Sequence, residues 1–101
     1  MRFYLPYDVY TNTVRTTLRR ADGSDKRFDL MGTHYGEQWD DPSEIYIEVK
    51  NVRTDSGLSS EWRDFVASAY SATHYAWDLG RDPQWQFMFA STHAWSARGR
   101  A

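Results

Sequence analysis

Residues Ser59 to Gly80 read SSEWRDFVASAYSATHYAWDLG and give the clearest structural signal in the chain. Its apolar residues recur at intervals of three and four, which is typical of one face of an α-helix. That face is expected to carry Trp62, Phe65, Val66, Ala69, Thr73, Ala76 and Trp77, and the opposite side Arg63, Ala67, Ser68, Ser71 and Asp78. Ser59 or Ser60 is predicted to cap the first turn, and Gly80 to end the helix before Pro83. A helix of about 20 residues is roughly 30 Å long. We therefore expect one long helix whose tryptophan face the other elements bury.

Five segments alternate apolar and polar residues in the manner of β-strands. They are Phe3–Val9, Val14–Leu18, Phe28–Leu30, Ile45–Val49 and Trp85–Phe89. Pro6 cannot donate to a strand ladder, so the first segment is predicted to be an edge strand or a broken one. The segment from Gly32 to Ser43 is predicted to be a loop. The order β-(β-β)-β-α-β predicts the α+β class, with an antiparallel sheet of four to five strands packed against one long helix.

The second and third strand segments are predicted to form a hairpin. A three-residue loop over Asp22–Ser24 is favoured, because it places Leu18 opposite Phe28 and leaves one face of the hairpin apolar. The other face would then place Arg19 opposite Arg27, with Arg15 nearby. Such a patch could bind phosphate or an acidic partner, or it could simply be solvated.

The composition indicates a folded chain with aromatic residues to spare. The 101 residues are 41% hydrophobic and 17% aromatic, which a disordered chain would not be. We expect one domain over residues 1–101, with residues 94–101 as a frayed tail. Tyrosine, tryptophan and arginine recur at binding hot spots, so the surplus rings are candidates for a contact surface. The alternative is that wide rings fill a thin two-layer core.

The charge is unevenly distributed along the chain. The formal net charge is −2, but residues 36–64 contain eight acidic and three basic side chains. An acidic middle third repels phosphate, which argues against nucleic-acid binding as the main function. It favours instead a partner with a basic surface.

The predicted loop in this acidic third holds the first candidate contact residues. They are Glu37, Trp39, Asp40 and Asp41. A tryptophan beside carboxylates suits a contact with a basic protein surface. The alternative is that Trp39 folds back onto the sheet and the acidic residues only keep the loop soluble.

Several function classes lack a signature in this sequence. There is no cysteine, which excludes a disulfide framework and a thiolate metal site and fits a reducing compartment. No apolar run approaches the length of a membrane span, and no secretion signal is seen, so we expect a cytoplasmic protein. No phosphate-binding glycine loop or nucleophile elbow is present. No cofactor, metal site or catalytic residue is therefore predicted.

By elimination, the sequence favours a non-enzymatic protein-binding module. A compact acidic α+β chain of this size suits an inhibitor that blocks a basic surface of its target, and toxin-immunity and phage anti-defence proteins are analogous in kind. The alternatives are a small-ligand-binding domain, with a pocket between helix and sheet, or a nucleic-acid-binding domain. Self-association through a sheet edge, giving a homodimer, is a further alternative.

Overall fold

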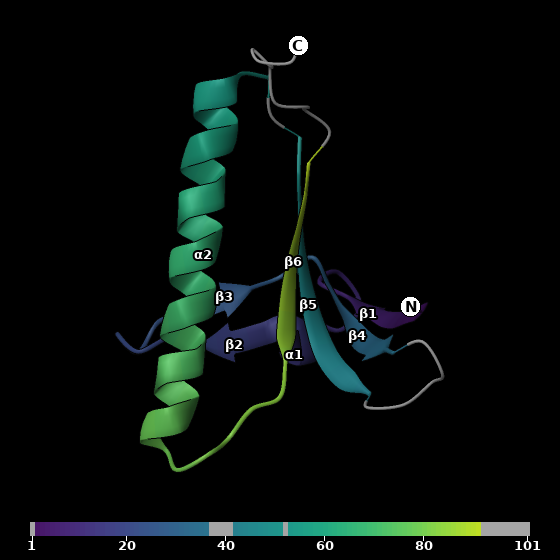
Figure 1. The fold of residues 1–101 in the computed structure, drawn as a ribbon, viewed down its shortest axis with the longest axis vertical. Coiled ribbons are helices and arrows are strands. Elements are labelled where there is room, and N and C mark those ends of the chain that lie inside the picture. The colour runs from purple at the N-terminus through teal and green to yellow at the C-terminus, as the bar shows by residue number, and fades with distance from the viewer. Residues whose placement is uncertain (1, 37–41, 52, 92–101) are drawn as a thin grey trace.

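The computed structural model describes residues 2–36, 42–51 and 53–91 as a four-stranded sheet, a two-stranded hairpin and one long helix (Figure 1). In chain order the elements are β1 (Arg2–Asp8), α1 (Thr13–Thr16), β2 (Thr17–Arg19), β3 (Asp25–Arg27), β4 (Leu30–Tyr35), β5 (Ser43–Lys50), α2 (Asp55–Asp78) and β6 (Gln86–Ser91). The sheet has the order β1-β4-β5-β6, and β2 and β3 pair separately. The hairpin extends from the sheet to α2 (Figure 1). The predicted α+β class is confirmed.

The sheet is mixed, whereas the sequence predicted an antiparallel one. β1, β4 and β5 are antiparallel neighbours, but β6 runs parallel to β5, with Ile45 opposite Gln86 and Lys50 opposite Ser91. The reason is the long helix between them. It carries the chain back along the sheet, so the following strand starts at the same end as β5.

Helix α2 begins earlier than predicted and ends where predicted. Its N-cap is Thr54, whose side-chain oxygen accepts a hydrogen bond from the Gly57 amide at 2.9 Å, so the predicted cap at Ser59 or Ser60 is wrong. The helix ends at Asp78, and Gly80 has a φ of +79°, a left-handed conformation that glycine adopts without strain. The predicted stop at Gly80 is confirmed.

The buried face of α2 is rotated relative to the predicted one. The buried apolar residues of α2 are Leu58, Phe65, Ala72 and Ala76. The polar residue Ser68 is also buried, although it was predicted to lie on the solvent side. In contrast, Trp62, Val66 and Trp77 are exposed. The hairpin explains the rotation. It packs on the serine side of α2, where Ser68 accepts a hydrogen bond from Arg20 Nη1 and Ser71 accepts one from the Ala21 amide.

Strand β4 replaces the start of the predicted loop. Its residues pair with both neighbours, with Met31 opposite Tyr7 on β1 and opposite Tyr46 on β5. Gly32 permits β4 to pair with β1 at this point, and it also explains why the sequence pattern did not indicate a strand. A Cβ at this position would overlap the carbonyl oxygen of Tyr4 and lie 2.7 Å from the Cα of Leu5, so only glycine lets β1 approach. That glycine also breaks the alternating pattern.

Strand β1 confirms the prediction made from Pro6. It lies at one edge of the sheet, and its register against β4 shifts between Tyr4 and Tyr7, on either side of the proline. The missing backbone donor therefore falls in an irregular part of an edge strand.

The hairpin is shorter than predicted, and its predicted register is wrong. Residues Thr13–Thr16 form a helical turn, in which Thr16 Oγ1 donates to the carbonyls of Asn12 and Thr13. The hairpin loop is shifted by one residue, because the Arg20 amide bonds to the Ser24 carbonyl and Gly23 takes a φ of +88°. As a result Leu18 lies opposite Lys26, and Arg19 lies opposite Asp25 instead of Arg27.

Aromatic rings fill the core between sheet and helix. Phe28, which is 0% exposed, forms its centre with Met31, Tyr46 and Phe65. Trp85, Phe87 and Phe89 pack against this cluster. Trp85 and Phe87 are thus partly buried members of the core.

Candidate functional site

The acidic residues that the sequence singled out lie outside the described part of the chain. They are Glu37, Trp39, Asp40 and Asp41. Their role as a contact for a basic surface therefore stays a prediction.

Two of the three predicted arginines share one surface. Arg19 and Arg27 line a shallow groove together with Thr13, Val14, Thr17 and Asp25. Arg19 is neutralised there, because its Nε lies 2.6 Å from Asp25 Oδ1. Arg15 is not among the lining residues, and its guanidinium lies 5.2 Å from the centre of the Tyr7 ring. The three arginines are thus divided between a groove and a cation–π contact.

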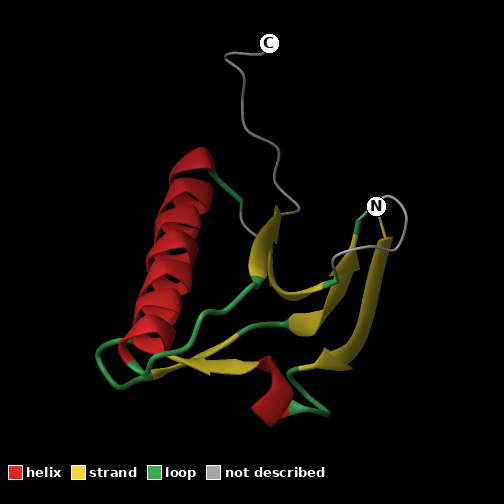
Figure 2. Ribbon diagram, turned by 60° about the horizontal axis from the view of Figure 1, so that its bottom comes forward, coloured by secondary structure: helices red, strands yellow, loops and turns green. Residues whose placement is uncertain are grey.

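The groove adjoins a turn that displays two apolar side chains. Tyr10 is 92% exposed and Val14 is 86% exposed, the two highest values among the large hydrophobic residues that the structure describes. Figure 2 shows this turn and α1 at the periphery, at the end of the hairpin away from α2. The sequence pattern did not indicate this surface, because Val14 falls in a segment with the alternation of a β-strand.

Asp8 holds the turn in one conformation. Its Oδ1 accepts hydrogen bonds from the amides of Tyr10 and Thr11, both at 2.9 Å, and its carbonyl accepts one from the Asn12 amide at the same distance. The bond from the Thr11 amide is the main reason that the pKa of Asp8 is lowered. Side-chain bonding of this kind is the mechanism by which aspartate nucleates turns. Tyr10 is therefore presented on a fixed backbone.

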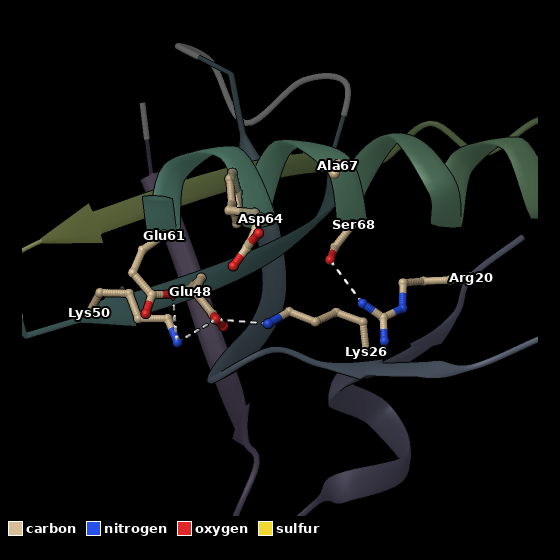
Figure 3. Close-up of a pocket in the computed structure, with 9 residues that line it drawn as sticks. Arg20, Lys26, Glu48, Lys50, Glu61, Asp64, Ala67 and Ser68 are labelled. Carbon is tan, nitrogen blue, oxygen red and sulfur yellow. Dashed lines mark hydrogen bonds and ion pairs between the residues drawn. The ribbon is translucent and has the colours of Figure 1, made fainter. Parts of the chain in front are cut away.

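A second feature is a cavity of about 380 Å³ between α2, β5 and the hairpin, lined by charged side chains (Figure 3). Glu48 lies at its base with its side chain only 5% exposed. The same oxygen, Oε2, is 2.8 Å from Lys26 Nζ and 3.3 Å from Lys50 Nζ. Lys50 also reaches Glu61 on α2 at 3.5 Å. The sequence pattern had placed Glu48 on the polar side of a strand, so its burial was not predicted.

This cluster joins three elements and has its charges paired. Glu48 belongs to β5, Lys26 to β3 and Glu61 to α2. Burial alone would lower the pKa of Lys50, but the hydrogen bond and the charge of Glu48, supported by Glu61, outweigh it and raise the pKa. A lysine held protonated between two carboxylates is a poor general base. The arrangement is therefore best explained as a network that fixes the hairpin and the helix on the sheet.

One buried phenol gives a prediction for alkaline pH. Burial, with a contribution from Glu44, raises the pKa of Tyr46 from 10.0 to about 12. Between these values the unfolded chain has lost the phenolic proton and the folded chain keeps it, so stability must fall as the pH rises. Two pKa units correspond to about 3 kcal/mol. We expect Tyr46→Phe to flatten the decline in unfolding free energy between pH 10 and 12, measured by urea denaturation. Tyr4→Phe, at an exposed position, serves as the control, and an equal decline in the Tyr46→Phe protein would contradict the assignment.

No protein-family model, no curated protein and no solved structure matches the chain. Over the described ranges, no group of three or more histidine, aspartate or glutamate side chains is placed to hold a metal ion. Within the same ranges, no helix combines the length and the apolar character needed to cross a membrane.

Proposed function

We propose that this chain is a non-enzymatic protein-binding module that inhibits a target protein by covering a charged surface. The mechanism is steric and electrostatic blockade, in the manner of toxin-immunity or phage anti-defence proteins, and the absence of cysteine suits a target in the cytoplasm. The observation that carries the proposal is the turn that presents Tyr10 and Val14 to solvent.

This turn has the properties of a preorganised contact. Tyrosine and arginine are enriched at binding hot spots, and here an exposed tyrosine lies near a groove lined by Arg19 and Arg27. Because Asp8 already fixes the backbone, binding would require little further ordering of the loop. In the described part of the chain no ion pair joins Arg27 to a carboxylate, whereas Arg19 is paired with Asp25. Tyr10 is the expected anchor, and the charged groups around it would set the orientation.

The acidic segment supplies the second part of the proposal. Glu37, Asp40 and Asp41 beside Trp39 favour a target with a basic surface. The arginine groove, in contrast, favours carboxylates on the target. The two regions therefore predict opposite responses to charge reversal, which makes their contributions separable.

The test is affinity capture from untreated host lysate, with a nuclease-treated sample as the control, followed by binding measurements with the purified partner. We expect Tyr10→Ala to weaken binding by at least about tenfold, the effect of losing a hot-spot residue. Asn12→Ala, in the same turn, is the matched control and should bind normally. If the target surface is basic, Trp39→Ala with Asp40→Ala should abolish binding, and Arg19→Glu with Arg27→Glu should leave it intact or tighten it.

Two results would overturn the proposal. One is recovery of nucleic acid without a protein partner, which would indicate that the chain binds nucleic acid through its arginines. The other is a partner that binds two variants as tightly as it binds the parent chain, namely Tyr10→Ala and the double variant Trp39→Ala with Asp40→Ala. Neither contact region would then be used. Melting temperatures of all variants should stay close to that of the parent chain.

A further inference from the structure

The two edges of the four-stranded sheet are protected to different extents. β1 carries Pro6 and a register shift, both of which discourage pairing with another chain. β6 has neither a proline nor a charged residue, and its register with β5 is continuous from Gln86 to Ser91. In the described part of the chain, β6 has one strand neighbour, β5. An uncharged, regular edge strand is a template for a further strand.

An exposed apolar stripe on α2 runs beside this edge. Its side chains are between 44% and 67% exposed. The stripe consists of Trp62, Val66, Tyr70 and Trp77. With 3.6 residues per turn, these four positions share a narrow sector of the helix surface, adjoining the buried face. Four large side chains of this kind in one sector form a patch and are not scattered surface residues.

Contacts on α2 fix the side to which the stripe belongs. Trp62 packs edge-on against Phe89 of β6, with ring centres 5.6 Å apart. Thr73 accepts a hydrogen bond from Trp85 Nε1 at 2.9 Å, one residue before β6. The opposite side of α2, at Ser68 and Ser71, holds the hairpin. The stripe therefore lies on the β6 side of α2, and Figure 1 shows α2 running alongside β6. The stripe and the strand edge are thus combined into one candidate surface.

This surface is complementary to itself under a two-fold axis. Trp62 and Trp77 are about 22 Å apart along the helix, and Tyr70 lies near their midpoint. Two antiparallel copies of α2 would therefore place Trp62 beside Trp77 of the other copy and bring the two Tyr70 rings together. A single axis perpendicular to the sheet also sets the two β6 edges antiparallel, the orientation needed for a continuous sheet.

Charge at the rim agrees with this arrangement. Arg63 follows Trp62, and Asp78 follows Trp77, on the side of the helix facing away from the sheet. In the antiparallel arrangement, Arg63 of each copy approaches Asp78 of the other. The stripe and β6 contain no charge, so no unpaired ion would be buried between the copies.

We propose that the occupant of this surface is a second copy of the chain, joined by antiparallel pairing of the β6 edges and packing of the α2 stripes. In this dimer the two β6 edges pair, the two stripes pack together and Arg63 of each copy lies near Asp78 of the other. An unrelated partner would need its own strand edge, apolar surface and charges in the same arrangement. The surface is separate from the turn at Tyr10, so the dimer does not depend on the proposed target.

The test is the molar mass of the full chain in solution, measured by light scattering and by sedimentation over a dilution series. We expect the parent chain to be a dimer. Tyr70→Glu puts two like charges at the axis and should raise the dimer dissociation constant by at least about tenfold. Ser60→Glu, an exposed position on α2 outside the stripe, is the matched control and should stay dimeric.

A charge exchange tests the antiparallel register. Arg63→Asp should weaken the dimer, because the carboxylate that it introduces would lie near Asp78 of the other copy, and adding Asp78→Arg should restore the dimer. Circular dichroism must show that α2 is intact in each variant. A parent chain that is monomeric at every concentration would overturn the proposal, including the case in which the stripe captures a different protein. A dimer that Tyr70→Glu does not weaken would overturn it equally.

Discussion

Glu48→Gln is expected to lower the free energy of unfolding by about 3 kcal/mol or more, since breaking a buried ion pair leaves an uncompensated charge. Lys26 Nζ and Lys50 Nζ both depend on Glu48 Oε2, at 2.8 and 3.3 Å. Lys50 keeps Glu61 after the substitution, but Lys26 loses the carboxylate to which it is bonded. Because β3 reaches β5 through Lys26, the hairpin should loosen first. Urea denaturation gives the magnitude, and hydrogen exchange shows whether the hairpin amides lose protection.

The exposed pair Arg19–Asp25 is the matched control. Its separation of 2.6 Å is shorter than either contact of Glu48, but both side chains are about half exposed. Water screens such a pair, so Asp25→Asn should cost less than about 1 kcal/mol. If Asp25→Asn lowers the free energy of unfolding as much as Glu48→Gln does, burial does not explain the contribution of the Glu48 network to stability. A double substitution, Glu48→Met with Lys26→Met, should recover part of the loss, because an apolar pair needs no charge partner.

The elements with a strong local pattern were predictable from the sequence. The helix was recognised from the three-and-four spacing that includes Phe65 and Ala76, and its end from Gly80. β5 and β6 follow strict alternation around Ile47 and Phe87, and Pro6 marked β1 as an edge. In each case the signal lies within a few residues of the feature that it predicts.

The errors arise where a distant element decides the outcome. Gly32 reads as a loop residue, and only the approach of β1 shows that a strand requires it. Ser68 reads as a solvent-facing residue, but Arg20 of the hairpin buries and bonds it. Spacing along the helix defines an apolar sector, whereas the elements packed on the helix define which part of that sector is covered.

In the candidate sites, too, features set by the local sequence were predictable and features set by other parts of the fold were not. The sequence placed Arg19 and Arg27 on one surface, and both line the groove. It could not predict that Asp25 would neutralise Arg19, because this depends on a one-residue shift of the hairpin loop. Nor could it predict the exposure of Tyr10, which depends on the hydrogen bonds of Asp8.

Gly32→Ala is expected to be strongly destabilising, because the structure has no space for the added methyl group. Gly32 is buried in the central strand β4, and its new Cβ would overlap the Tyr4 carbonyl oxygen and meet the Leu5 Cα. Both obstacles are backbone, so no side-chain rotation relieves the clash. β1 must move away from β4, with the loss of ladder hydrogen bonds next to the shift at Pro6. We expect the free energy of unfolding to fall by about 4 kcal/mol or more, a loss that single substitutions cause only through a specific structural disruption.

The matched control is Gly57→Ala in the first turn of α2. There the added Cβ meets only the side-chain oxygen of Thr54, at 3.0 Å, and the higher helix propensity of alanine offsets the crowding. The change in unfolding free energy should stay within about 1 kcal/mol. Hydrogen exchange separates the two possible failures of Gly32→Ala, since loss of protection confined to β1 and β4 indicates displacement of the edge strand. A Gly32→Ala protein as stable as the Gly57→Ala protein, with β1 still protected, would show that β1 does not approach β4 at this glycine.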